Sequence, residues 1–309
     1  METTQKPKEI IGHLMVLSKI IIYSFNTNFM KIIMPEWIAP HGLVLIRCTV
    51  MAFGFWIISL FIPASKQQAN PKRKDILMMM LGGLLGIGGN LLLYLNGLNI
   101  TGPVDAFVIR TVQPIVVIAL AVLILHVDFN RYKAIGIVLG LAGTLYVSIT
   151  PHTGMMKDSF TGDILVFVSS IFNALYLILI KPYTQKFNSI IVMRWMSLAA
   201  FILVLPFGLY QTVKAPLFTS GAPVHIWLEL GFVLVFATMI AYFLNLKALQ
   251  YITPFVESVY IYLLPITGAI VSISLGLQKF SWHDPIALVL IIAGFVLINK
   301  KKKVVINKS

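Results

Sequence analysis

The stretch LNGLNITGPVDAFVIRTVQPI at residues 95–115 returns later in the chain as LKALQYITPFVESVYIYLLPI at residues 246–266. The two align without a gap at an offset of 151 residues, and twelve identities occur at this offset between 95–143 and 246–294. A second offset of 147 residues pairs three more residues: Asn26 with Asn173, Pro35 with Pro182 and Arg47 with Arg194. Nearly the whole chain is therefore an internal duplication, which predicts two similar halves.

The composition indicates an integral membrane protein. The 309 residues are 58% hydrophobic and 11% charged, with a mean hydropathy of +0.90, whereas soluble domains carry about 25% charged residues. The apolar stretches have the length of membrane helices and lack the alternation of a transmembrane barrel, so we expect helices throughout. Ten can be drawn, at 12–33, 42–62, 75–96, 103–126, 132–150, 162–181, 189–211, 225–246, 254–277 and 284–300.

The net charge of +13 does not indicate a nucleic-acid partner, because the basic residues are distributed by membrane side. If the N-terminus is cytoplasmic, sixteen Lys and Arg residues fall in segments on the cytoplasmic side of the membrane. One of these segments is the loop at 63–74. Only Lys157, Lys214 and Lys279 fall in outer segments. This asymmetry follows the positive-inside rule and predicts that both termini are cytoplasmic, with 151–161 outside. The basic tail at 301–309 is expected to anchor the C-terminus at the anionic inner leaflet.

The ten predicted helices divide into a five-helix repeat at 10–150 and a second five-helix repeat at 160–300. Because five is odd, the second repeat enters the membrane from the opposite side. The predicted fold is thus all-α, with two inverted five-helix repeats around a central cavity.

Prolines and glycines mark special positions in this arrangement. Pro103 and Pro254 each open a predicted helix, where the missing N–H costs little. Pro114 and Pro265 fall eleven residues later, inside the fourth and ninth predicted helices, where proline kinks a helix. They are either hinges of a moving wall or packing kinks. The glycine-rich third helix is expected to pack closely against its neighbours.

On these features the chain resembles the EamA-type members of the drug/metabolite transporter superfamily. The resemblance rests on the two five-helix repeats, the repeated Pro-x10-Pro segment and the small-residue segments Gly136-x3-Gly140-x2-Gly143 and Ala293-Gly294. It implies that helices three, four, eight and nine line a central cavity and that helices one, two, six and seven close around it. It also implies movement of small metabolites, often export of amino acids or related solutes.

Polar side chains at membrane depth are expected to face a cavity or one another. Several recur at helical spacing on one face, such as Asn90 with Tyr94 and Thr238 with Tyr242 and Asn245. The alternative role for such stripes is hydrogen bonding between helices. The predicted substrate-binding residues are Arg110, Gln113, Asn90, Tyr94, Thr238, Tyr242, Asn245, Tyr260, Asn26 and Asn173.

Two charged residues stand out. Arg110 has an apolar repeat mate, Ile261, so the architecture does not require it, and a guanidinium binds an anionic group in a forked geometry. Glu257 is the candidate for proton coupling, and we expect it to pair with Arg194 or Lys247 rather than with Arg110. The repeat mates Arg47 and Arg194 are expected to be structural. For Arg47, the expected partner is Asp105 or Glu36.

No enzyme chemistry is predicted, because the six histidines are scattered, Cys48 is the only cysteine and no phosphate-binding Gly-x4-Gly-Lys-Ser/Thr segment occurs. We expect no metal and no cofactor. The partners expected are a small-molecule solute, the lipid bilayer and a coupled proton, for a monomer or homodimer in a bacterial inner membrane. The alternative classes are an intramembrane lipid-modifying enzyme and a structural membrane subunit.

Overall fold

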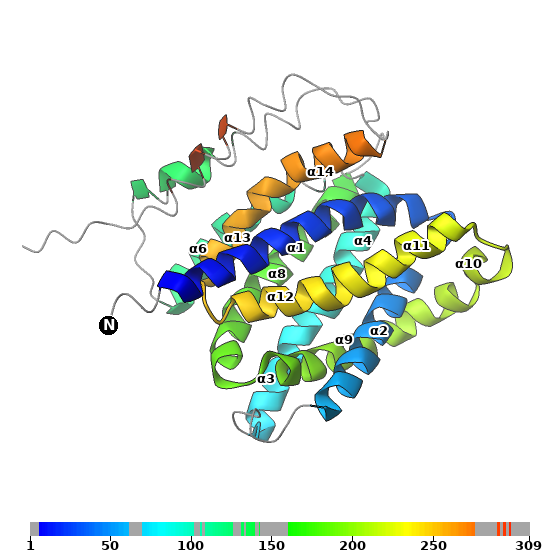
Figure 1. The fold of residues 1–309 in the computed structure, drawn as a ribbon, viewed down its shortest axis with the longest axis horizontal. Coiled ribbons are helices and arrows are strands. Elements are labelled where there is room, and N and C mark those ends of the chain that lie inside the picture. The colour runs from blue at the N-terminus through cyan, green and yellow to red at the C-terminus, as the bar shows by residue number, and fades with distance from the viewer. Residues whose placement is uncertain are drawn as a thin grey trace, which may run out of the picture.

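The computed structural model describes residues 6–61, 70–101, 109–125, 131–132, 134–139 and 160–275, together with 106, 142, 289–290, 293–294 and 297. All the regular structure in these ranges is helical (Figure 1). The predicted tenth helix at 284–300, the basic tail and the outer connection at 151–161 lie largely outside the described residues.

The first half begins with α1 (Lys6–Ile33) and α2 (Pro40–Leu60). One long span follows, made of α3 (Arg73–Gly83), the π-helical segment η2 (Leu84–Gly89) and α4 (Asn90–Thr101). It begins with a box in which the backbone N–H of Lys72 donates to the carboxylate of Asp75 at 3.0 Å. The first half continues with α6 (Gln113–Leu125).

The second half repeats this pattern with α8 (Phe160–Lys186) and α9 (Ser189–Val213). After the short α10 (Pro216–Thr219), a span is formed by α11 (Val224–Phe232), the π-helical η3 (Val233–Ile240) and α12 (Ala241–Ala248). The chain then forms α13 (Pro254–Val259), the 3-10 segment η4 (Tyr260–Leu263) and α14 (Leu264–Ser274).

Six helices in the described ranges are long and apolar enough to cross a membrane, and two of the ten predicted helices, at 132–150 and 284–300, lie mostly outside these ranges. They span Glu9–Ile33, Pro40–Leu60, Arg73–Thr101, Phe160–Lys186, Ser189–Val213 and Val224–Ala248. The helices expected at 103–126 and 254–277 are not among these six, because each is interrupted. In the first of these, a turn at 111–112 precedes α6, and in the second η4 separates α13 from α14.

These interruptions correct the expectation for the two repeated prolines. Pro114 is the second residue of α6 and Pro265 is the second residue of α14, so both lie in the first turn of a helix and not in an interior. A proline in a first turn removes no intrahelical hydrogen bond. Pro254 opens α13 as predicted, and the side chain of Thr253 accepts a hydrogen bond from the backbone N–H of Val256 at 3.2 Å.

The halves pack against each other through α2 with α9 and through α4 with α8. The glycines of the α3–η2 span permit close approach, as the sequence predicted. A Cβ on Gly83 would come within 2.0 Å of the backbone oxygen of Met196 on α9. A Cβ on Gly86 would come within 2.3 Å of the ring of Tyr176 on α8.

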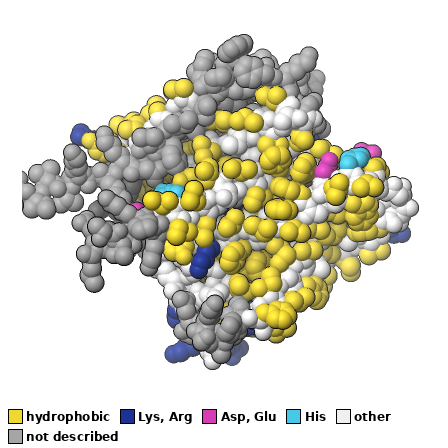
Figure 2. Space-filling view, in the orientation of Figure 1, with side chains coloured by type: hydrophobic (Ala, Val, Ile, Leu, Met, Phe, Trp, Pro, Cys, Tyr) yellow, Lys and Arg dark blue, Asp and Glu magenta, His cyan; other side chains and the backbone are white. Residues whose placement is uncertain are grey.

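The outer surface is apolar. Figure 2 shows hydrophobic side chains over most of the face crossed by α1, α11 and α12, with Lys and Arg gathered toward its margins. On α11, Val224 and Leu228 are 75% and 70% exposed. Such a continuous band would be unstable in water, so this face is the lipid-facing surface of a membrane protein.

Candidate functional site

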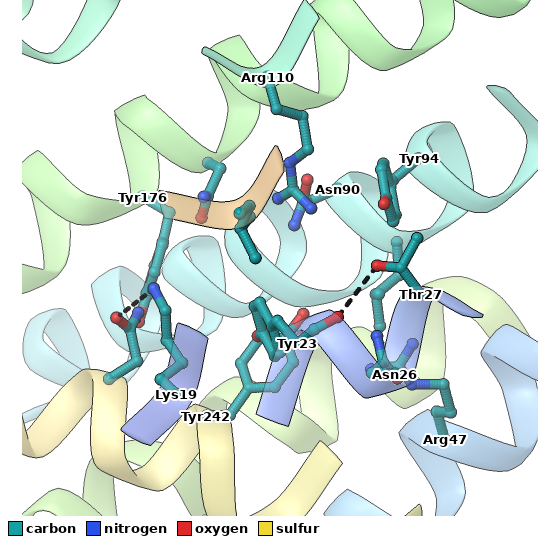
Figure 3. Close-up of a pocket in the computed structure, with 14 residues that line it drawn as sticks. Lys19, Tyr23, Asn26, Thr27, Arg47, Asn90, Tyr94, Arg110, Tyr176 and Tyr242 are labelled. Carbon is teal, nitrogen blue, oxygen red and sulfur yellow. Dashed lines mark hydrogen bonds between the residues drawn. The ribbon is translucent and has the colours of Figure 1, made fainter. Parts of the chain in front are cut away.

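A polar cavity lies between the two halves (Figure 3). Its first-half walls come from α1, α2, α4 and the segment before α6, which carries Arg110. Its second-half walls come from α8, α12 and α14. Helices one, two and six of the predicted order therefore contribute directly to the lining, beyond the four helices that the family resemblance implied.

Most of the predicted substrate-binding residues meet in this cavity, although they come from distant parts of the chain. Those that line it are Asn26, Asn90, Tyr94, Arg110, Asn173, Tyr242 and Asn245. Gln113 lies next to the lining, and its side-chain oxygen accepts a hydrogen bond from Asn173 at 3.0 Å. Thr238 lies behind the lining. Tyr260 lies apart from the lining and hydrogen-bonds His13 at 2.7 Å.

Arg110 projects into the cavity and is 8% exposed. Its guanidinium lies over the ring of Tyr94, with its central carbon 4.3 Å from the ring centroid. It forms no ion pair within the described part of the chain, and its buried Nε has no hydrogen-bond partner there. A cation at membrane depth is costly without a partner, so the guanidinium is available to an anionic ligand.

Arg47 lies elsewhere than the sequence predicted. It is 1% exposed and lines the cavity, whereas Glu36 is exposed at the surface and Asp105 lies outside the described residues. Its Nε donates to the hydroxyl of Thr238 at 2.8 Å, and one terminal nitrogen lies 3.1 Å from the sulfur of Met30. These uncharged neighbours hold the side chain but leave its charge uncompensated.

The pairing expected for Glu257 is also wrong. Glu257 is 2% exposed and pairs with Lys19 on α1, whose Nζ also donates to the side-chain oxygen of Asn245 at 3.0 Å. Arg194 instead stacks on Trp56 and Trp195, with its guanidinium carbon 4.8 and 5.1 Å from the ring centroids. Because Lys19 lines the cavity, the Lys19–Glu257 pair borders the binding space and links α1 to α13.

Sequence reasoning left several lining residues out of the predicted site: Lys19, Tyr23, Thr27, Arg47, Leu91, Tyr176 and Leu264. For three of them a signal was present, and one of the three is Tyr176, which follows Asn173 by three residues on α8. Lys19 and Tyr23 precede Asn26 by seven and three residues, so all three share one face of α1. Tyr23 and Tyr242 meet edge to face across the cavity wall, with ring centroids 6.5 Å apart.

The cavity offers hydrogen-bond acceptors as well as cations. The side-chain oxygens of Asn26 and Asn90 are buried and have no donor within the described residues. A buried polar group without a partner costs about 1–3 kcal/mol, so a bound molecule with hydroxyl or amino groups would be stabilised there. The cavity volume is about 30 Å³, against the roughly 10–15 Å³ that is needed to hold one water molecule, so the cavity has room for a few water molecules at most. A metabolite therefore fits only if the walls separate.

The described ranges contain no evident metal-binding site. Among these residues there is no group of three His, Cys, Asp or Glu side chains that could hold a metal ion. Cys48 is buried and unpaired by any disulfide. The lining offers hydrogen-bonding and cationic side chains to a bound molecule.

The fold and this cavity define an all-helical integral membrane protein with a polar site between two halves. The model of the EamA-like transporter family matches residues 10–149 and again residues 160–300. The chain therefore belongs to the EamA-like transporter family, as its repeated sequence suggested.

Two similar proteins are named as uncharacterized transporters. Over 241 residues the chain is 22% identical to the uncharacterized transporter YetK of Bacillus subtilis, covering 75% of this chain and 70% of that protein. Over 260 residues it is 22% identical to the uncharacterized transporter YyaM of the same organism, covering 84% of each. A crystal structure of another protein superposes with a TM-score of 0.73 at 16% identity, covering 95% of this chain and 96% of the other, and so shares its fold.

Proposed function

We propose that this protein is a secondary transporter that exports small organic metabolites, amino acids or related solutes, by alternating access. The observation that carries the proposal is the cavity itself. Polar and cationic side chains from both halves converge at membrane depth, where such groups mark the path of a substrate or an ion. A structural membrane subunit would not require polar and cationic side chains at membrane depth, where they are energetically costly.

The proposed mechanism uses ten helices arranged as two inverted five-helix repeats, at 10–150 and 160–300. In such proteins one half rocks against the other around a site near the bilayer midplane. The π-helical segments η2 and η3 occupy similar places in the two halves and support this symmetry. The repeated prolines Pro114 and Pro265 stand where α6 and α14 begin, and there they would act as hinges.

Proton coupling is part of the same proposal. Glu257 is the candidate proton acceptor, and the ion pair with Lys19 is the contact that a proton would break. Because Lys19 also borders the cavity, protonation of Glu257 would free a cation beside the solute. We place the protein in a bacterial inner membrane with both termini in the cytoplasm, as the distribution of basic residues indicates. An intramembrane lipid-modifying enzyme is the alternative class, but among the described residues the cavity lining contains no Asp, Glu or His to act as a catalytic acid or base.

Transport is testable with purified protein in vesicles. Proteoliposomes would be incubated with a metabolite extract, and the solutes that enter would be identified by mass spectrometry against protein-free vesicles. Leu264→Trp adds bulk to the cavity wall and should abolish entry. Leu228→Trp is the matched control, because Leu228 is 70% exposed on the lipid-facing surface. If wild-type protein moves no component of the extract, or if both variants behave alike, the proposed function is wrong.

A further inference from the structure

We infer that the transported solute carries two negative charges, one held by Arg110 and the other by Arg47. This inference rests on the proposed transport function and narrows its substrate class. It begins from the charges that face the cavity, which are Lys19, Arg47 and Arg110. Lys19 is neutralised by Glu257. Two positive charges therefore remain uncompensated by the described residues.

Both arginines retain donors for a ligand. A guanidinium has five N–H donors. Arg47 directs its Nε to Thr238 and one terminal nitrogen to Met30, and so has further N–H groups available. Arg110 makes only a ring contact with Tyr94 among its described interactions. Each side chain can therefore bind an acidic group without breaking an ion pair.

The two arginines approach from different sides. In Figure 3, the guanidinium of Arg110 points toward Asn90, and Arg47 lies beyond Thr27 and Asn26. Polar amide and hydroxyl groups thus lie between the two cations. A single carboxylate would compensate one charge and leave the other buried, which is costly at membrane depth. A solute with two negative charges compensates both.

The repeat provides a contrast that supports this assignment. Arg47 and Arg194 are mates at the offset of 147 residues, yet Arg194 is packed against Trp56 and Trp195 outside the cavity. The mate of Arg110 is Ile261. The duplication therefore does not account for the meeting of two arginines at one cavity, whereas binding of a doubly charged anion does.

The first test needs no variant. Succinate, succinamate and succinamide share one carbon frame and carry two, one and no negative charges near neutral pH. Each would be titrated calorimetrically into purified protein in detergent at constant ionic strength, alongside glutarate with its monoamide and glycerol 3-phosphate with glycerol. We expect at least one of the three dianions to bind, and the affinity in its series to fall about 10-fold or more with each charge removed. The phosphate arm separates a phosphomonoester from a dicarboxylate.

The second test assigns the charges to residues. Arg110→Gln and Arg47→Gln should each weaken the binding dianion by about 10- to 150-fold, the range for a charged hydrogen bond. Arg194→Gln is the matched control and should leave the affinity unchanged. If no dianion binds more tightly than its monoanionic or neutral counterpart, the inference is wrong even if the vesicle assay shows transport. If the vesicle assay finds no transport while dianions bind as expected, the proposed function fails instead.

Discussion

Replacing Lys19 with methionine removes the charged partner of a carboxylate that is almost completely buried. The side chain of Glu257 is 1% exposed and that of Lys19 is 10% exposed, so water cannot replace the lost contact. The second carboxylate oxygen of Glu257 already lacks a hydrogen-bond partner within the described residues. Removing one member of a buried pair costs about 3–5 kcal/mol, and we expect Lys19→Met to fall in this range.

Replacing the other member of the pair, in Glu257→Gln, should lower the unfolding free energy by less. In Glu257→Gln, Lys19 keeps its hydrogen bond to Asn245, and the new amide oxygen can still accept from its ammonium group. The double variant Lys19→Met/Glu257→Gln removes both charges and so leaves neither of them buried without its partner. Its unfolding free energy should therefore recover about 2 kcal/mol or more relative to Lys19→Met alone.

Unfolding of each variant would be followed by tryptophan fluorescence in a denaturant titration of the detergent-solubilised protein. Lys186→Met is the control, because the side chain of Lys186 is 52% exposed and its pair with Asp75 is screened by water. The control should lose little stability. If Lys19→Met loses no more than the control, or if the double variant is less stable than Lys19→Met, the pair does not hold α1 to α13 as described.

Three further predictions follow from the topology, the helix breaks and the glycine contacts. In a cysteine-free background, a membrane-impermeant thiol reagent applied outside should label Ser220→Cys and spare Asn70→Cys, and the opposite pattern would reverse the orientation. Pro114→Ala should change the transport rate while leaving the yield of folded protein nearly unaltered, whereas an unaltered rate would make this proline a packing residue. Gly86→Ala should destabilise the fold by about 1–3 kcal/mol because its Cβ would overlap the ring of Tyr176. Gly231→Ala is the control and should leave the stability unchanged, because a Cβ there has no neighbouring atom within 4 Å. Equal thermal stabilities of the two variants would contradict the packing.

The membrane class and the family could be read from the sequence because they depend on local or linear properties. Hydropathy needs only the composition of short windows, and the duplication needs only a comparison of the chain with itself. The break within the ninth predicted helix was less predictable. Apolar composition does not reveal the interruption at 260–263, because the same residues suit an α-helix and a 3-10 turn.

Much of the candidate site was also visible, since polar residues at helical spacing inside apolar segments must face a cavity or one another. The stripe on α1 shows the limit of this reasoning. Lys19, Tyr23 and Asn26 share one face, but nothing in the spacing says whether Lys19 serves the solute or another side chain. In the structure, Lys19 forms an ion pair with Glu257, which lies 238 residues away in the sequence.

The sequence by itself determined that this chain is an all-helical membrane protein, that it is duplicated and that polar side chains lie within its membrane-embedded segments. Tertiary structure alone decided which charges are paired. Arg47 and Arg194 occupy equivalent places in the repeat, yet one faces the cavity and the other stacks on tryptophans. Helix packing sets how each helix is rotated about its own axis, and that rotation, which no local pattern encodes, determines whether a buried cation meets a carboxylate, a ring or the solute.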